Sequence, residues 1–195
     1  YLAAKLRLFS ELAKEGGAAV VNADADHGQD FIAAARRRRL TLLTVGARGT
    51  DLRLTAQAPR DGGQDVTILY KEREYRIALP LAGSFQASNA LVAAGLVLSL
   101  GEPAQDVFAA LATLKGAPGR LELVARTRQG AAIYVDYAHT PDAIETVLKA
   151  LRPHVKGQLH IVFGCGGDRD RGKRPLMAQA AALLARALLG QGRVE

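Results

Sequence analysis

Two short apolar runs, each ending in a polar loop, constrain the fold of this chain most strongly. Residues 18–21 and 40–45 have the length and composition of buried strands, and residues 29–37 between them are predicted to form a helix. The polar loop 22–26 follows the first of these strands directly. Alternating strands and helices are typical of α/β proteins with a parallel sheet, which bind ligands at the carboxyl ends of their strands. The sequence therefore predicts an α/β fold with candidate sites in these loops.

Residues 50–80 follow a different pattern, in which apolar and polar side chains alternate. The apolar members are Leu52, Leu54, Val66, Ile68, Tyr70, Tyr75, Ile77 and Leu79. Gly62 and Gly63 supply a turn, so we predict antiparallel strands in a small sheet with one face exposed to solvent. Helical patterns precede this part at 2–12 and follow it at 89–94 and 107–114.

A cluster of structure-breaking residues at 115–119 marks a candidate domain boundary. We therefore expect two domains, residues 1–115 and 116–195. Beyond the boundary the predicted elements are strand 133–135, helix 141–151, strand 159–163 and a helix from Pro175. Because the chain begins inside an amphipathic pattern and stops just after an Ala- and Leu-rich stretch, we expect it to be part of a larger protein.

The composition is that of an ordinary globular protein. The 195 residues weigh 20.7 kDa and are 49% hydrophobic, which is enough for a buried core. The single cysteine, Cys165, has no partner within the chain, as is usual in the reducing cytosol. No apolar run approaches the roughly 20 residues that span a bilayer. We expect a cytoplasmic protein without membrane insertion.

The net charge of +7 raises the question of a nucleic-acid partner. Its most concentrated source is the run of arginines at 36–39, which can form a solvated helix end where cations complement the dipole. No aromatic stacking platform accompanies this run, and a protein that binds phosphates or carboxylates explains the charge equally well. We expect no nucleic-acid partner, with a non-catalytic basic binding module as the alternative.

The segment 163–175 combines glycines and cations directly after a predicted strand. The glycines at 164, 166 and 167 let backbone N–H groups approach an anion closely. Charge-assisted hydrogen bonds to a carboxylate or phosphate are available from Arg169, Arg171, Lys173 and Arg174. The segment lacks the spacing of a Walker A loop, and a solvated charged loop is the alternative. No Cys/His constellation supports a nucleophilic role for Cys165, which is interpreted as a small packing residue.

Three further residues have both a functional and an ordinary interpretation. Asp136 and His139 lie in a loop that leads into the helix at 141–151, where they can bind a ribose hydroxyl and a phosphate or act structurally. Asn89, near the start of a predicted helix, either caps the turn or contacts a ligand.

Six stretches of the chain carry a family resemblance when they are taken in order. They are YLAAKLRLFSEL, NADAD, GSFQASNALVAA, APGRLE, VDYAHTPDA and FGCGGDRDRGKRP. Together they resemble the Mur ligase family, the ATP-dependent amino-acid ligases of peptidoglycan synthesis. The pair DYAHTPDA and GCGGDRD is most similar to members that add meso-diaminopimelate to UDP-N-acetylmuramoyl-L-alanyl-D-glutamate. The alternatives are ligases of the L-lysine, folylpolyglutamate or cyanophycin type.

The resemblance implies a fold and a reaction. Residues 1–115 would be the later part of a P-loop-type central ATPase domain with a small antiparallel sheet, and residues 116–195 the start of a Rossmann-like C-terminal domain. ATP would phosphorylate the terminal carboxylate of the UDP-substrate, and the incoming amine would attack the acyl phosphate. The family's phosphate loop and its Asp-Asn-Pro-Arg motif are absent from the chain. We therefore expect the chain alone to be inactive. The expected working form of the whole enzyme is a monomer.

The resemblance also assigns residues to roles. Lys5, which by itself would be a surface residue on an amphipathic helix, matches a catalytic carbamylated lysine that binds Mg²⁺ at the reacting phosphate. Arg169 matches the arginine that recognises the carboxylate of the incoming amino acid. The residues matched to ATP contacts are Asn89 near the adenine, Arg120, Asp136 and His139, the last of which is also assigned a catalytic role.

Overall fold

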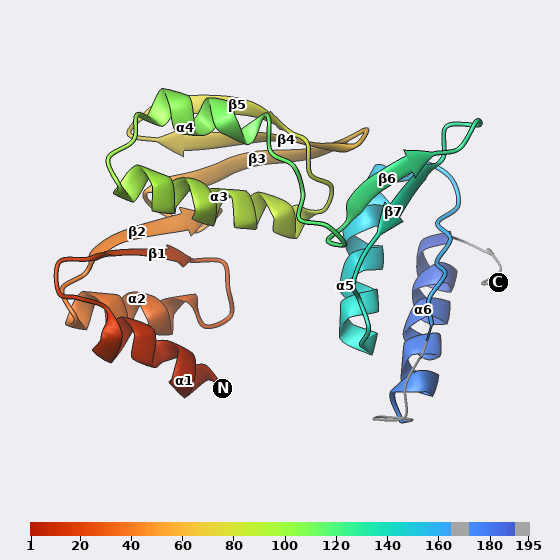
Figure 1. The fold of residues 1–195 in the computed structure, drawn as a ribbon, viewed down its shortest axis with the longest axis horizontal. Coiled ribbons are helices and arrows are strands. Elements are labelled where there is room, and N and C mark those ends of the chain that lie inside the picture. The colour runs from red at the N-terminus through yellow and green to blue at the C-terminus, as the bar shows by residue number, and fades with distance from the viewer. Residues whose placement is uncertain (165–171, 190–195) are drawn as a thin grey trace. The chain divides into compact units, whose positions relative to one another are not determined.

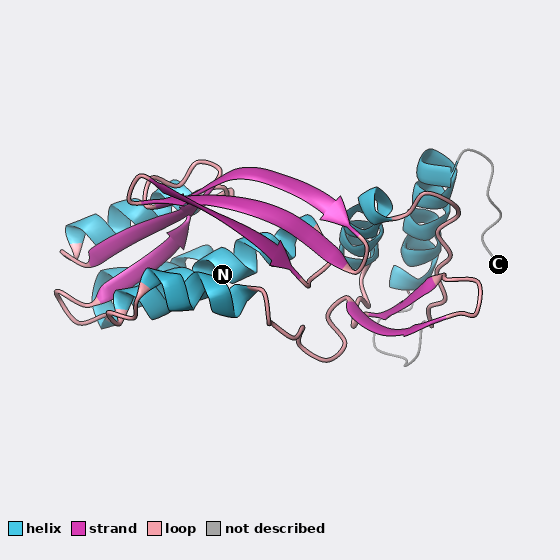
Figure 2. Ribbon diagram, turned by 90° about the horizontal axis from the view of Figure 1, so that it is seen from above, coloured by secondary structure: helices cyan, strands magenta, loops and turns pink. Residues whose placement is uncertain are grey.

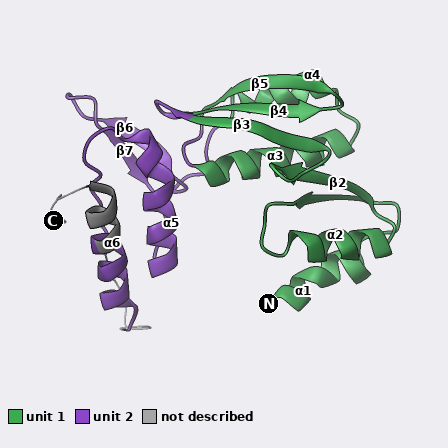
Figure 3. Cartoon of the chain, turned by 180° about the vertical axis from the view of Figure 1, so that it is seen from behind, with its two compact units in different colours: residues 1–58, 64–80, 84–114 green, residues 59–63, 81–83, 115–195 purple. Residues whose placement is uncertain are grey.

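The structure is a computed structural model that describes residues 1–164 and 172–189. It divides into two compact units (Figure 3). Unit 1 comprises residues 1–58, 64–80 and 84–114, and unit 2 comprises residues 59–63, 81–83 and 115–195. The two short internal segments, 59–63 and 81–83, group with the later part of the chain, which no sequence pattern predicted.

The sheet of unit 1 has the strand order β1-β2-β3-β4-β5 (Figure 1). The alignment of Ala18 with Thr41 and of Val45 with Leu52 makes the first three strands parallel, whereas β4 and β5 are antiparallel. The predicted strands are therefore confirmed. Those of residues 50–80 do not form a small sheet of their own, because they belong to the same mixed, twisted sheet as the first two strands (Figure 2). The strands are β1 (Ala18–Asn22), β2 (Thr41–Gly46), β3 (Leu52–Arg60), β4 (Gly63–Tyr70) and β5 (Arg73–Leu79).

Alternate residues of β1 face helices on opposite sides of the sheet. Ala19 and Val21 are buried in clusters with residues of α2. Val20 points the other way, toward α3, where a Cβ added to Gly95 would lie 2.7 Å from its Cγ1. Glycine at this position therefore lets α3 approach the sheet closely. The longer helices of unit 1 are α2 (Gly28–Arg37), α3 (Ser84–Ser99) and α4 (Ala104–Leu111).

The first helix is shorter than its sequence pattern predicts. It consists of α1 (Leu2–Arg7), followed by a π-helical turn, η1 (Leu8–Leu12). At the end of this turn the N–H of Ala13 donates to the carbonyl of Leu8 at 2.8 Å. π-Helical turns are uncommon and interrupt the regular 3.6-residue spacing, which explains why periodicity alone missed this one.

Unit 2 contains a two-stranded antiparallel sheet and two principal helices. The N–H of Ala143 donates to the Thr140 hydroxyl at 3.2 Å, which caps the helix that begins at Pro141. The core of the unit is formed by Ile144, Leu148, Met177 and Ala181. The elements are β6 (Glu122–Arg126), β7 (Ala132–Val135), α5 (Pro141–Leu151), the 3₁₀ turn η2 (Arg152–His154) and α6 (Lys173–Leu189).

The strand predicted at 159–163 is not found. Its alternation is present, because Leu159, Ile161 and Phe163 pack against the core of unit 2 while Val162 is 97% exposed. A strand also needs a hydrogen-bonded neighbour, and β7 pairs with β6. Apolar alternation in this segment therefore indicates packing without a ladder.

Candidate functional site

Asp136 follows β7 directly and holds two loops together. Its Oδ2 accepts a hydrogen bond from the backbone N–H of Leu121 at 2.9 Å, and its Oδ1 accepts one from the N–H of Ala138 at 2.8 Å. Leu121 is 5% exposed and has a φ of 47°, a left-handed conformation that leucine seldom adopts. The carboxylate thus stabilises an unusual turn next to Arg120.

Arg120, Tyr137 and His139 form a row beside that turn, which we call the Arg–Tyr–His row. The Cζ of Arg120 lies 5.2 Å from the centroid of the Tyr137 ring. The rings of Tyr137 and His139 meet edge to face, with centroids 4.9 Å apart. All three side chains are exposed, that of Tyr137 by 66%. The row therefore presents a cation, an aromatic ring and an imidazole to solvent.

The hydrogen bond of His139 identifies the ring nitrogen that carries the proton. Its Nδ1 lies 2.9 Å from the carbonyl oxygen of Tyr137, which can only accept a hydrogen bond. Nδ1 is therefore the donor. Nε2 makes no hydrogen bond to residues 1–164 or 172–189, and it can accept from a ligand when neutral or donate when protonated. An open imidazole nitrogen near a guanidinium suits a phosphate.

The structure brings together three of the residues that the sequence analysis selected. Asp136 binds the residue after Arg120, and the ring of Tyr137 contacts both Arg120 and His139. Tyr137 had no predicted role. The sequence feature that could have indicated one is an aromatic residue inside a polar loop that follows a strand, where an α/β protein binds ligands.

Asn89 lies in the second turn of α3 in unit 1, so it does not cap that helix. Its Nδ2 donates to the side-chain oxygen of Gln86 at 3.2 Å. Gln86 is 7% exposed, whereas Asn89 is exposed. The buried amide thus orients the exposed one near the start of the helix.

Lys5 is exposed on α1, and its Nζ lies 4.4 Å from the centroid of the Tyr1 ring. Mg²⁺ requires several oxygen ligands. No group of three or more His, Cys, Asp or Glu side chains able to hold a metal ion occurs among the described residues. The described residues therefore do not make up a magnesium site by themselves, even if Lys5 is counted as a carbamate.

Two residues of the glycine-rich segment, Arg169 and Cys165, lie outside the described residues. Of this segment, the structure describes residues 163–164 and 172–175, and α6 starts at Lys173. Its expected role in binding a carboxylate stays a prediction.

The arginine run at 36–39 is divided between different environments. Arg36 and Arg37 occupy the last turn of α2, as expected for cations that complement the helix dipole. The Nε of Arg38 donates to the carbonyl of Ala13 at 3.0 Å, and Arg39 forms an ion pair with Glu15 at 3.2 Å. Half of the run is therefore engaged within unit 1 and does not form a continuous cationic surface.

Two family descriptions match the chain. The Mur ligase middle domain matches residues 1–97, and the Mur ligase glutamate ligase domain matches residues 119–190. Among individual relatives, the UDP-N-acetylmuramoyl-L-alanyl-D-glutamate–2,6-diaminopimelate ligase of Caulobacter vibrioides is 53% identical over 185 residues, which are 95% of this chain. The ligase of the same name from Bradyrhizobium diazoefficiens is 51% identical over 93% of the chain. The chain spans 38% of the length of each relative.

Solved structures give the same result for the fold. A UDP-N-acetylmuramoyl-L-alanyl-D-glutamate–2,6-diaminopimelate ligase is similar with a TM-score of 0.70 and 36% identity, over 93% of this chain and 37% of the solved one. MurF from Acinetobacter baumannii is similar with a TM-score of 0.78 over 96% of this chain and 40% of its own, and at 21% identity it supports the fold alone.

No helix in the described part of the chain is long and apolar enough to cross a membrane. The chain belongs to the Mur ligase family.

Proposed function

We propose that this chain is part of an ATP-dependent ligase that adds meso-diaminopimelate to UDP-N-acetylmuramoyl-L-alanyl-D-glutamate through an acyl phosphate. The observation that carries the proposal is the assembly of Arg120, Asp136 and His139 around one exposed turn. Relatives named for this reaction are 53% and 51% identical to almost the whole chain, which supports the choice of reaction. We propose the cytoplasm as the compartment and a monomer as the working form.

The proposed domain assignment places residues 1–115 in the central domain and residues 116–195 in the C-terminal domain. It is supported by the two family matches, which end at residue 97 and begin at residue 119. The structure-breaking residues at 115–119 lie in the chain between α4, the last helix of unit 1, and β6, the first strand of unit 2.

In this proposal the Arg–Tyr–His row binds the nucleotide. The guanidinium of Arg120 pairs with a phosphate oxygen, and the Nε2 of His139 binds a second oxygen as donor or acceptor according to its protonation. Asp136 positions both, because its two hydrogen bonds hold the loops on which they stand. ATP supplies the phosphoryl group that activates the substrate carboxylate.

The remaining site residues enter the proposal on resemblance. Asn89 contributes to the adenine pocket, and Arg169 recognises the carboxylate of the incoming amino acid. Lys5, as a carbamate, is one oxygen ligand of Mg²⁺. The described residues do not complete that metal site by themselves.

The test is ATP-dependent tripeptide formation by the full-length protein that contains this chain. We expect ADP release and product with meso-diaminopimelate and at least about 100-fold less with L-lysine, a discrimination typical of sites that bind a substrate's polar group. Equal rates with L-lysine, or product only with glutamate on a folate, would contradict the proposal. The 195-residue chain alone is expected to be inactive, because it spans 38% of its relatives.

Lys5→Ala in the full-length protein tests the carbamate separately. We expect it to abolish activity and a short carboxylate in solution to restore part of it, because an added carboxylate replaces the lost oxygen ligand. Full activity without rescue would leave Lys5 a surface residue.

A further inference from the structure

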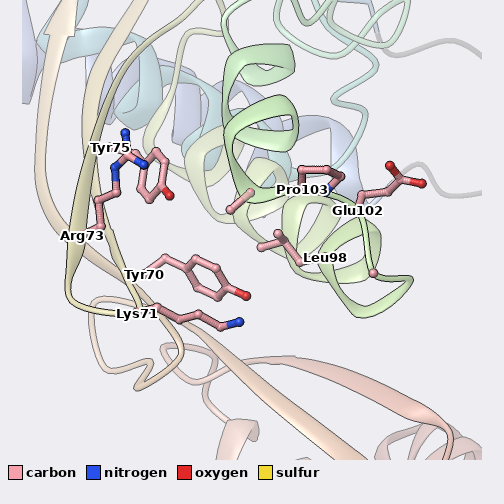
Figure 4. Close-up of a pocket in the computed structure, with 9 residues that line it drawn as sticks. Tyr70, Lys71, Arg73, Tyr75, Leu98, Glu102 and Pro103 are labelled. Atoms are coloured by element: carbon pink, nitrogen blue, oxygen red, sulfur yellow. The ribbon is translucent and has the colours of Figure 1, made fainter.

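A hollow on unit 1 lies outside every residue assigned so far. It has a volume of about 360 Å³ and lies between the β4–β5 hairpin and the segment that joins α3 to α4 (Figure 4). The residues that matter for its chemistry are Tyr70, Lys71, Arg73 and Tyr75 on the hairpin and Leu98 and Pro103 on the opposite wall.

Phe108 of α4 packs against both tyrosine rings. Phe108 is 2% exposed, and its ring centroid lies 5.8 Å from that of Tyr70 and 4.2 Å from that of Tyr75. Because this packing fixes both rings without a ligand, the hollow is largely preformed. Leu98 and Pro103 add apolar surface across from the rings (Figure 4). This combination favours a planar ring as the occupant.

Two cations stand beside these rings. The Nζ of Lys71 lies 5.2 Å from the centroid of Tyr70, and the Cζ of Arg73 lies 5.1 Å from that of Tyr75. Neither side chain forms an ion pair or a hydrogen bond within residues 1–164 and 172–189. Their charges therefore remain available to an anion.

The turn of the β4–β5 hairpin, which carries Lys71, has an unusual backbone conformation. Tyr70 and Arg73 are paired opposite each other, so Lys71 and Glu72 form a two-residue loop. Their φ angles of 47° and 62° lie in the left-handed region, where such loops normally carry asparagine or glycine. A strained turn with long charged side chains is more typical of a functional surface than of a neutral connection.

We propose that this hollow binds a small planar ring that carries one anionic group, either a phosphate or a carboxylate. The ring lies against the tyrosines, Leu98 and Pro103, and the anion pairs with Arg73 beside Tyr75. The volume of about 360 Å³ is within the range of small-molecule sites. This site is independent of the proposed ligase reaction.

Glu102 provides a test of whether the ligand carries a negative or a positive charge. It lies on the opposite lip of the hollow, and its carboxylate is turned away from the tyrosines (Figure 4). A carboxylate near the entrance weakens the binding of an anion and strengthens that of an amine. Its removal therefore has opposite effects for the two kinds of ligand.

The experiment is a ¹⁹F NMR titration of the full-length protein labelled with fluorotyrosine, in which Tyr70 and Tyr75 are assigned by replacement with Phe. The probes are phenyl phosphate and benzoate, and the controls are inorganic phosphate and benzyl alcohol. We expect both tyrosine signals to shift with a Kd of about 1 mM or lower for at least one probe. The tighter probe identifies the anion as phosphate or carboxylate. Inorganic phosphate and benzyl alcohol should each bind at least about tenfold more weakly.

Three variants locate the site. Arg73→Gln should weaken binding about tenfold, whereas Glu102→Gln should strengthen it about twofold. Arg76→Gln is the matched control, because Arg76 is on the same strand, 83% exposed and outside the hollow, and it should leave the Kd unchanged. The proposal is overturned if neither probe shifts the two tyrosines, if inorganic phosphate binds equally well, or if Glu102→Gln weakens binding.

Discussion

Two carboxylates at the ends of strands have the same structural role in the two units, but only one lies beside a surface suited to a ligand. Asp24, just after β1, accepts hydrogen bonds from the N–H groups of Ala47 at 2.7 Å and Arg48 at 2.8 Å. Asp136, just after β7, accepts from Leu121 at 2.9 Å and from Ala138 at 2.8 Å. Each carboxylate joins the loop after its own strand to a second loop.

The surroundings of the two carboxylates differ. Asp24 has the guanidinium of Arg48 at 3.5 Å as its ion-pair partner within the described residues. Asp136 instead supports the Arg–Tyr–His row, whose side chains are exposed. A carboxylate after a strand therefore indicates a loop that is stabilised by hydrogen bonds. The candidate site is indicated by the exposed side chains that such a loop holds in position. The proposed function depends on this difference.

Among the variants that test this comparison, the largest effect is expected for Asp136→Ala in the full-length protein. It removes two hydrogen bonds to a charged acceptor, and we expect kcat/KM for ATP to fall about 100-fold or more, because Arg120 and His139 lose their relative position. Steady-state kinetics at varied ATP concentration measures this effect. Asp136→Asn keeps one acceptor oxygen and should lose less. A loss no larger than that of Asp24→Ala would remove the distinction between the two carboxylates.

Asp24→Ala is the counterpart and should act on stability. It also removes two charge-assisted hydrogen bonds, so we expect the free energy of unfolding to fall by about 2–3 kcal/mol. The KM for ATP should stay within about twofold where the variant is folded. Urea denaturation gives the first quantity and kinetics the second. A tenfold rise in KM would show that Asp24 belongs to the nucleotide site.

Tyr137→Leu tests the row itself. Loss of the ring removes the cation–π contact with Arg120 and the edge contact with His139, so we expect the KM for ATP to rise about fivefold to tenfold. Tyr137→Phe keeps the ring and should stay within about twofold of the original KM. Equal behaviour of the two variants would assign the effect to the hydroxyl or to folding.

The smallest expected effect is a change in the pKa of Tyr134 when the charge of Asp61 is removed. Burial raises the pKa of Tyr134, Asp61 raises it further, and Arg126 lowers it. Asp61→Asn should therefore lower the pKa of Tyr134, whereas Arg126→Gln should raise it, as measured by phenolate absorbance. Because its pKa is raised in the folded state, the phenol of Tyr134 stabilises the fold at pH values below its unfolded pKa of about 10. This stabilisation is lost as the pH rises through the folded-state pKa. An unchanged phenolate titration in both variants would contradict the assignment.

Local patterns predicted most of the elements and missed those that depend on a partner. The helix at 141–151 was predictable because Thr140 and Pro141 are ordinary signals of a helix start. The strand expected at 159–163 has the correct alternation but no ladder, and β6 was not predicted at all. Strand formation depends on a neighbour that can lie far away in the chain, so alternation alone does not decide it.

The sequence by itself determined most of the elements in their order, the family and the candidate residues Arg120, Asp136 and His139, because periodicity and motifs are properties of short windows. The tertiary structure decided that Asp136 binds a backbone N–H next to Arg120 and that the Tyr137 ring contacts both Arg120 and His139. It also decided that Lys71 and Arg73 stand beside tyrosine rings fixed by Phe108. The contacts of Asp136 with Leu121, of Arg120 with Tyr137 and of Phe108 with the two tyrosines join segments that are far apart in the chain. Their geometry depends on packing and backbone hydrogen bonds that no local pattern contains.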